Sequence, residues 1–408
     1  MAWLYLIFSL LLLLNVAISI KPIRVSPLSN FSFAVGWLTS ELAIPWFAIS
    51  VVVTSLFVIY GASNSVVGIG ASIVTAIAWI GLGHIVSVAY GAAKTCKDAL
   101  EEGLDFKSDS NTLSIAGSFW RDFVPFSWKP KNIEVIRNID YVGDNIKRHK
   151  LDIYRLASDE KSNESKTLYP VLLYIHGGAW MVGSKEQQAR PMIHTLAPKG
   201  FICISINYRL SPKATWPDHI VDCKRAIHWA KSNIAQYGGD PNRIAIAGGS
   251  AGGHLCALAA LSANDPEFQP GFEEADTSVA AAIPIYGVLD LTDSLEIGVD
   301  QLTHLLEKNV FKSKLKDNKE IWEKASPLFR ISENIPPLYV IQGTNDTLVP
   351  PQMAREFVRV CKDKSQNPIC YAEIKEAQHA FEVFWSPRTR YVVASIYNFL
   401  NVTLQNGK

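Results

Sequence analysis

The hydrophobic positions of this chain follow one pattern in the first 90 residues and another after about residue 133. Three almost uncharged stretches come first, at residues 3–20, 42–60 and 66–90. Each is long enough to cross a bilayer, which needs about 20 apolar residues. The second and third stretches offer no polar face to water, so they favour membrane helices over buried core helices. The pattern therefore predicts about three membrane spans.

The first stretch has a second interpretation, a cleaved signal peptide. Its start, MAWLYLIF, lacks the basic residues of such a leader and no small-x-small site follows it, so a retained span is favoured. With three spans, the basic residues that flank them fall on the same side as the rest of the chain: Lys21, Arg24, Lys94 and Lys97. The positive-inside rule then predicts an integral membrane protein with a cytoplasmic C-terminal domain, and loss of the first span reverses this orientation.

From about residue 133 the chain alternates short apolar runs with helical segments. Runs such as YPVLLYI, FICISINY and NRIAIAG are apolar on both faces, which is typical of parallel strands covered by helices on both sides. Eight strand-like runs predict an α/β fold with a mostly parallel eight-stranded sheet. We expect a membrane region at residues 1–92, a juxtamembrane connection at 93–132 and an α/β domain at 133–408. Within it, residues 291–335 form an insertion that either caps a pocket or covers the sheet edge.

Charge and cysteine content exclude several classes of function. The formal net charge is +1, so no basic or acidic excess indicates a nucleic acid or an acidic partner. The six cysteines have neither the spacing of a metal site nor the density of a disulfide framework. Several lie within apolar patterns, which predicts buried free thiols. We expect no metal and no cofactor.

The strand-like run RIAIAG leads directly into GGSAGGH, which places Ser250 in a GxSxG motif. A serine on a sharp strand-to-helix turn needs small neighbours, because the strand and the helix approach each other closely there. A glycine-rich turn without chemistry is the alternative, since the motif also arises by chance. The helical segment AGGHLCALAALSA that follows favours a nucleophile.

A serine nucleophile needs a base, and in this kind of fold the chain order is serine, acid, histidine. His379 lies in a short loop after the last strand-like run, where a base belongs. His254 sits on the helix that follows Ser250, and His304 lies in the charged insertion. We therefore predict His379 as the base, with an ordinary surface histidine as the alternative.

The orienting carboxylate is expected directly after the preceding strand. The run LYVIQGTNDTLVPP places Asp346 at that position, and Asp363 is a competing aspartate near the end of a helix. A loop aspartate often serves only to cap the next helix. Its place in the required order favours Asp346 as the acid of the triad.

The run VLLYIHGGAW ends a buried strand with a histidine, two glycines and a tryptophan. An ester or amide attacked by a serine develops negative charge on its carbonyl oxygen, which fixed backbone N–H groups stabilise. One expected donor is the amide of Ala251, and we expect Gly177 and Gly178 to supply the others. His176 is expected to brace the loop, and Trp180 to form a wall of the site. A plain glycine turn is the alternative.

From about residue 133 onward the chain resembles α/β-hydrolases of the esterase and lipase type. The resemblance rests on HGGAW, GGSAG, GTNDTLVPP and the loop histidine. It is strongest to members with an HGGxW loop, such as prenylcysteine methylesterases, arylformamidases and carboxylesterases related to hormone-sensitive lipase. The last of these have a third glycine where this chain has Ala179. The resemblance implies a serine hydrolase that cleaves small or lipid-like esters through an acyl-enzyme, with Ser250, Asp346 and His379 as the triad.

Two other functions stay open. The same triad serves amidases and peptidases, and the run QGTNDTLVPPQMAREF also resembles serine peptidases of this fold. The second is a binding protein of this fold without activity, although both nucleophile and base are present. The membrane region has only His84 and Glu41 as plausible acid–base groups, and we expect His84 to hydrogen-bond a neighbouring carbonyl. That region is therefore expected to supply location and access for apolar substrates, and nothing to bond cleavage.

Overall fold

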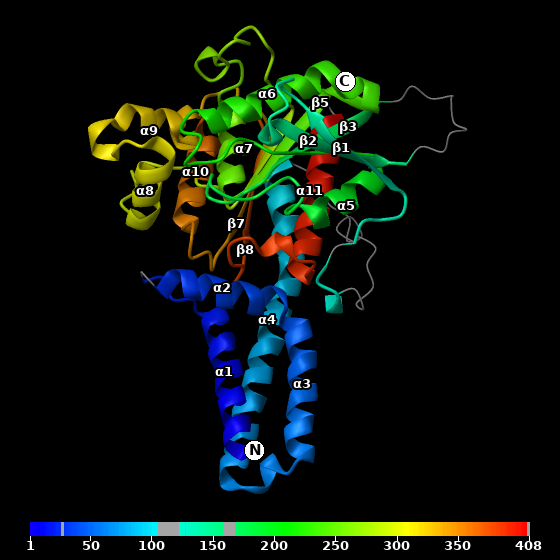
Figure 1. Ribbon diagram of the computed structural model, residues 1–408, viewed down its shortest axis with the longest axis vertical. Helices are drawn as coiled ribbons and strands as arrows, with labels where there is room; N and C mark the ends of the chain where they lie inside the picture. The colour runs from blue at the N-terminus through cyan, green and yellow to red at the C-terminus, as the bar shows by residue number, and fades with distance from the viewer. Residues whose placement is uncertain (26–27, 105–121, 127, 158–167, 406–408) are drawn as a thin grey trace.

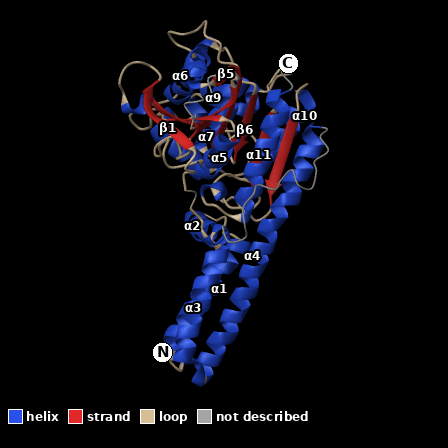
Figure 2. Ribbon diagram, turned by 90° about the vertical axis from the view of Figure 1, so that its right-hand side faces the viewer, coloured by secondary structure: helices blue, strands red, loops and turns tan. Residues whose placement is uncertain are grey.

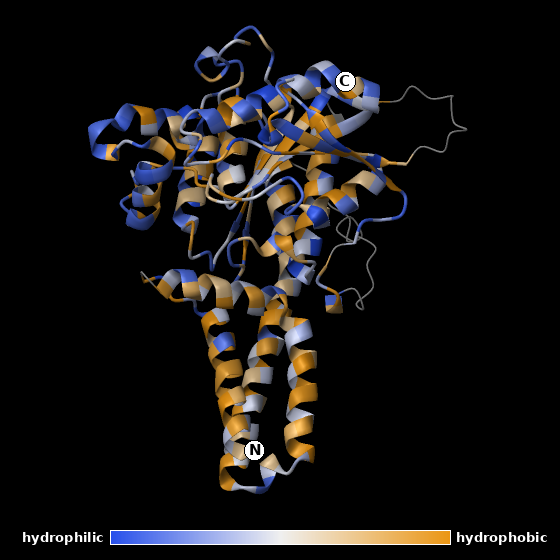
Figure 3. Cartoon of the chain, in the orientation of Figure 1, coloured by the Kyte–Doolittle hydropathy of each residue, from blue (hydrophilic) through white to orange (hydrophobic). Residues whose placement is uncertain are grey.

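The structure, a computed structural model, describes residues 1–25, 28–104, 122–126, 128–157 and 168–405. A narrow bundle of helices stands beneath an α/β domain, with the N-terminus at the far end of the bundle (Figure 1). Hydrophobic residues dominate the bundle, whereas polar and apolar residues are mixed in the domain (Figure 3). The two patterns of the sequence therefore correspond to two parts of one structure.

An eight-stranded sheet forms the centre of the α/β domain, which confirms the predicted fold class. The strands lie in the order β1-β2-β4-β3-β5-β6-β7-β8, and all neighbours are parallel except that β2 is antiparallel to β1 and β4. Because parallel strands end at one edge, the loops after β3, β5, β7 and β8 gather there. The strands are β1 (Ile133–Asp140), β2 (Lys150–Leu156), β3 (Tyr169–Ile175), β4 (Ile202–Ile206), β5 (Gly239–Gly249), β6 (Ala281–Ile285), β7 (Leu338–Gly343) and β8 (Ile369–Ile374).

Helices cover both faces of the sheet, as strands that are apolar on both faces predict. Along β3, Val171 and Leu173 face a core shared with α6, α7 and α10. Leu172 and Tyr174 face a second core shared with α5 and α11. The helices are α5 (Arg190–Leu196), α6 (Asp218–Asn233), α7 (Ala251–Leu261), α10 (Pro351–Lys364) and α11 (Pro387–Gln405). All six cysteines are free and buried, which confirms that prediction.

Three long helices form the N-terminal bundle. They are α1 (Ala2–Ile20), α3 (Ala43–Ile59) and α4 (Val66–Leu104). By length and composition, α1 and α4 could each cross a membrane, and α3 adds a third span when it is counted together with the helix before it. The described residues thus offer two candidate spans, or three with this bent pair.

The last of these helices does not end with its apolar stretch. α4 continues into the α/β domain, where Cys96 and Leu100 are buried in the core that includes β8 and α11. Residues 93–104 are therefore part of the packed domain and not of a connection, because their small and apolar side chains cover the sheet. Residues 105–121 and 127 of the predicted connection lie outside the described residues.

The helix before α3 was not predicted. α2 (Leu28–Glu41) meets α3 at a bend of 83°. It lies crosswise between the bundle and the α/β domain (Figures 1 and 2). Its sequence mixes aromatic residues with serine, threonine and glycine, so it shows neither the length of a span nor a regular amphipathic repeat.

The predicted insertion, residues 291–335, folds into short helices beside α7. They are α8 (Asp300–Leu306), a π-helical turn (Glu307–Phe311) and α9 (Lys319–Ala325). The Leu291 amide donates to Ser326 Oγ at 2.9 Å, which closes the insertion at its base. Residues 297–302 also line a cavity next to Asp346. The insertion therefore both packs on the domain and borders the loop of the predicted acid.

Candidate active site

The sharp turn between β5 and α7 carries Ser250. Its backbone has φ 58° and ψ −123°, a region that non-glycine residues rarely occupy and that is found at strained functional turns. A Cβ on Gly252 would lie 2.1 Å from the carbonyl oxygen of Ile175, so the helix approaches the strand too closely for any larger residue. The Ser250 amide donates to the Ile285 carbonyl at 3.0 Å, which ties the turn to β6.

The structure brings the predicted acid and base together. Nδ1 of His379 lies 2.7 Å from Oδ2 of Asp346, and this carboxylate is fully buried. Its Oδ1 accepts the N–H groups of Leu348 and Val349 at 2.9 and 2.8 Å. These bonds fix the carboxylate, which in turn orients the imidazole. The competing Asp363 is exposed and pairs with an arginine of its own helix.

Gln378 joins the loop of the acid to the loop of the base. Its Oε1 accepts the N–H of Thr347 at 2.8 Å and that of His379 at 2.9 Å. The two loops are therefore held as one unit at the end of β7 and β8. Sequence reasoning missed this glutamine, whose one signal was its place next to the loop histidine.

Tyr286, directly after β6, contacts both the serine turn and the base. Its ring lies 4.6 Å from the His379 ring, and a Cβ on Gly249 would lie 2.7 Å from its hydroxyl oxygen. The hydroxyl donates to the Glu382 carboxylate. Burial raises the pKa of both Tyr286 and Glu382, so the phenol stays protonated. Ser250 and His379 thus share one edge of the sheet, although no hydrogen bond joins them within the described residues.

The glycine loop after β3 lies beside the serine turn. A Cβ on Gly177 would lie 3.1 Å from Ser250 Cβ. The Gly177 amide donates to Gln188 Oε1 at 2.7 Å, so this predicted oxyanion donor is already engaged. Gly178 has φ 121°, which favours glycine. In the part of the chain that the structure describes, neither its amide nor that of Ala251 has a hydrogen-bond acceptor.

The buried side chains of His176 and Trp180 support the glycine loop. Nδ1 of His176 lies 2.7 Å from the Gly177 carbonyl oxygen, and the ring stacks on Tyr208 at 4.4 Å. Burial lowers the pKa of His176 to about 4, so the ring is neutral. Trp180 is buried and donates its indole N–H to Nδ1 of His254 at 3.3 Å. Its indole N–H thus has a partner in the core, and the ring supports the glycine loop.

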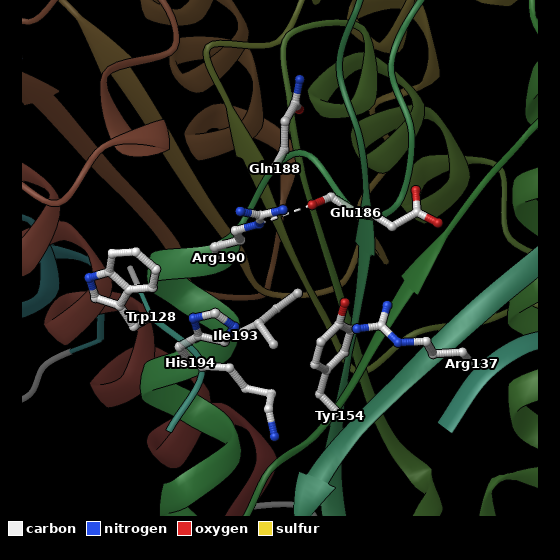
Figure 4. A pocket seen from close by; sticks show the side chains of 9 residues that line it. Trp128, Arg137, Tyr154, Glu186, Gln188, Arg190, Ile193 and His194 are labelled. Atoms are coloured by element: carbon white, nitrogen blue, oxygen red, sulfur yellow. Dashed lines mark hydrogen bonds between the residues drawn. The ribbon is translucent and has the colours of Figure 1, made fainter. Parts of the chain in front are cut away.

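A pocket of about 190 Å³ has Gln188 among its lining residues (Figure 4). Arg137, Tyr154 and Arg190 are among its lining residues. Nε of Arg190 donates to the carbonyl oxygen of Glu186 at 3.0 Å. Gln188 thus lines this polar pocket and also accepts the Gly177 amide of the glycine loop.

Both acid–base groups of the membrane region bond to the α/β domain. Nε2 of His84 lies 3.1 Å from a carboxylate oxygen of Glu376, not from a carbonyl of its own span as expected. The reason is that α4 passes next to the loop of the base. Glu41, at the end of α2, is buried and pairs with Arg388 of α11 at 2.5 Å.

Metal ligands do not gather anywhere in the described ranges. Among those residues, no group of three or more His, Cys, Asp or Glu side chains could hold a metal ion.

The parallel sheet, the strained serine turn after β5 and the histidine–aspartate pair after β7 and β8 define the α/β-hydrolase class. Residues 151–360 match the BD-FAE family. The chain belongs to this family.

Known relatives are named as esterases. The chain is 47% identical over 258 residues to LipM, a probable carboxylic ester hydrolase of Mycobacterium tuberculosis, with 63% of this chain and 59% of LipM covered. It is 30% identical over 233 residues to ICME, an isoprenylcysteine alpha-carbonyl methylesterase of Arabidopsis thaliana, with 55% of this chain and 52% of ICME covered. The chain thus spans little more than half the length of these relatives.

A solved structure shares the fold. A truncated carbohydrate esterase from gut microbiota is similar with a TM-score of 0.57 and 22% identity, covering 67% of this chain and 99% of that chain. At this identity the likeness shows the fold of the α/β domain.

Proposed function

We propose that the protein is a membrane-anchored serine hydrolase that cleaves carboxylic esters through an acyl-enzyme. The observation that carries the proposal is the arrangement of Ser250, on its strained turn, at the same sheet edge as the bonded pair His379 and Asp346. The esterase names of the relatives support carboxylic esters as the substrate class.

The reaction begins at Ser250. Its Oγ bonds to the ester carbonyl carbon while His379 Nε2 accepts the hydroxyl proton and the carbonyl electron pair moves to the oxygen. Asp346 holds Nδ1–H and stabilises the imidazolium. The tetrahedral intermediate expels the alkoxide, which takes the proton from His379 and leaves as the alcohol. Water then gives a proton to His379 and its oxygen to the acyl carbon, so the carboxylic acid leaves and Ser250 regains its proton.

The negative oxygen of each tetrahedral intermediate needs fixed donors. We assign the amides of Gly178 and Ala251 to this role, because both lack an acceptor within the described residues. Each such donor is typically worth a few kcal/mol in the transition state. Gly177 remains bonded to Gln188 and shapes the loop instead.

The bundle is the proposed membrane anchor. Large apolar side chains such as Trp3, Val66 and Ile80 are 68%, 87% and 74% exposed, which is favourable in lipid and unfavourable in water. α1, α3 and α4 then cross the bilayer, and the positive-inside rule places the α/β domain in the cytoplasm.

The full-length protein in detergent micelles tests the chemistry. Ser250→Ala and His379→Ala are each expected to lower kcat for p-nitrophenyl butyrate by about four or more orders of magnitude, because triad members act as a unit. Ser250→Ala also abolishes labelling by a fluorophosphonate. His304→Ala, an exposed histidine of the insertion, is the matched control and keeps full activity. Normal turnover by Ser250→Ala contradicts the proposal, and cleavage of p-nitroanilides without esters indicates an amidase.

A further inference from the structure

α2 contacts the loops of the predicted acid and base. It runs beneath the loops after β7 and β8 and across the end of the bundle (Figures 1 and 2). Leu28, Phe31 and Leu38 of this helix are 51%, 53% and 39% exposed. A short helix that turns by 83° from a membrane span and exposes apolar side chains has the geometry of a helix at a membrane surface.

The start of α2 holds the loop of the acid. Arg24, just before the helix, donates to the carbonyl oxygens of Asp346 and Thr344 at 2.7 and 2.8 Å. The Thr347 hydroxyl donates to the carbonyl oxygen of Ser29 at 3.3 Å. Asp346 and its neighbour Thr347 are therefore tied to the start of α2 and the residues just before it.

The middle of α2 borders the base. The indole N–H of Trp37 donates to the carbonyl oxygen of Ala380, the residue after His379, at 2.8 Å. The ring of Phe33 meets the His379 ring edge to face, with centroids 6.1 Å apart. Phe33 is half-buried, so part of its ring stays accessible beside the imidazole.

Open space reaches the acid loop from the same side. A cavity of about 370 Å³ lies between α2 and the insertion. Arg24 and Ser29, residues 297–302 and Asp346 are among its lining residues. Through Ser29, α2 thus lines a space that opens onto the loop of Asp346.

We propose that α2 is the membrane-side wall of the active site, and that the substrate is an amphiphilic ester entering from the bilayer surface with its hydrocarbon chain against Phe33. This inference rests on the proposed function and names its substrate class. A hydrocarbon chain that passes from lipid to an apolar wall avoids exposure to water, so such an ester reaches Ser250 without the cost of leaving the bilayer.

The test uses the full-length protein in phosphatidylcholine vesicles with two esters, water-soluble p-nitrophenyl acetate and bilayer-dissolved p-nitrophenyl palmitate. Phe33→Ala is expected to lower kcat/KM for the palmitate about tenfold and to change that for the acetate less than about twofold, because the ring contacts the chain and not the reacting atoms. Phe33→Leu keeps an apolar side chain and retains most palmitate activity. Phe47→Ala, which removes an exposed aromatic of α3 away from the proposed wall, is the matched control and leaves both rates unchanged.

An unchanged ratio of palmitate to acetate activity in Phe33→Ala overturns the inference. An equal loss on both esters also overturns it, because Phe33 would then only support His379. If Phe33→Ala does not react with a fluorophosphonate, the same ratio is measured in Phe33→Trp, which narrows the entrance and is expected to lower palmitate turnover selectively. Failure of the proposed function looks different, since the wild-type protein then cleaves neither ester.

Discussion

The two halves of the candidate active site are built from different parts of the molecule. The serine turn and the glycine loop are held by bonds within the α/β domain, from Ser250 to Ile285 and from Gly177 to Gln188. The acid and base loops are also held by the N-terminal region, through Arg24 and Trp37. The nucleophile half therefore depends on local backbone geometry, whereas the acid–base half depends on contacts between segments far apart in the sequence.

This difference changes the role of the membrane region. A bundle that supplied location alone would meet the α/β domain away from the chemistry. Instead, the ring of Phe33 contacts that of His379, and the carbonyl oxygen of Ser29 in α2 accepts a hydrogen bond from Thr347 in the loop of Asp346. The expectation that the region adds nothing to bond cleavage gives no account of these contacts.

The largest expected effect falls on the acid itself. Asp346→Asn should lower kcat by about four orders of magnitude, because the amide no longer orients and stabilises the imidazolium correctly. Steady-state turnover of p-nitrophenyl butyrate by the full-length protein measures it. Asp363→Asn, the exposed aspartate of α10, is the control and should be silent. If Asp363→Asn lowers kcat and Asp346→Asn does not, Asp363 is the acid of the triad.

Removal of the buried ion pair at the end of the membrane-side helix should have the next largest effect. Glu41→Ala leaves the fully buried Arg388 without its carboxylate, and breaking such a pair costs about 3–5 kcal/mol of stability. The thermal unfolding midpoint in micelles should fall accordingly, and Glu41→Ala with Arg388→Met should recover most of the loss. Asp363→Ala removes an exposed ion pair, and this loss should lower the free energy of unfolding by less than about 1 kcal/mol. Equal decreases in the unfolding midpoint for Glu41→Ala and Asp363→Ala would show that the pair of Glu41 and Arg388 does not anchor α2.

Arg24→Ala should have the smallest of the three effects. It removes two charge-assisted bonds to the backbone of the acid loop, and we expect kcat to fall about tenfold with little change in KM. Unfolding of the protein should stay unchanged, which separates positioning from stability. Lys21→Ala removes the same charge a few residues earlier. If it lowers kcat equally, long-range charge and not hydrogen bonding supports the acid loop.

The sequence predicts the α/β domain almost strand by strand, for a physical reason. Strands buried on both faces, such as β3 and β4, are almost entirely apolar, and glycine, proline and asparagine mark their ends. Ser250 is recognisable because its turn is local and needs glycines on both sides. Asp346 and His379 follow from chain order alone, since parallel strands end at one edge of the sheet.

The remaining features depend on long-range contacts that leave no local pattern. Trp37 and Ala380 are 343 positions apart, so the sequence near either residue does not predict the hydrogen bond between them. Gln188 reaches Gly177 across a loop, and its effect on the oxyanion donors shows only in three dimensions. The burial of Trp180 is likewise set by where His254 comes to lie on α7.

α4 joins the bundle to the α/β domain as one continuous helix. This helix of 39 residues is roughly 60 Å long at 1.5 Å per residue. Its N-terminal half packs in the bundle through Leu82, and its C-terminal half packs against the sheet through Leu100. A change in the orientation of the α/β domain relative to the bundle therefore requires α4 to bend. In the proposed membrane-anchored hydrolase, this helix would hold the catalytic loops at one height above the lipid surface.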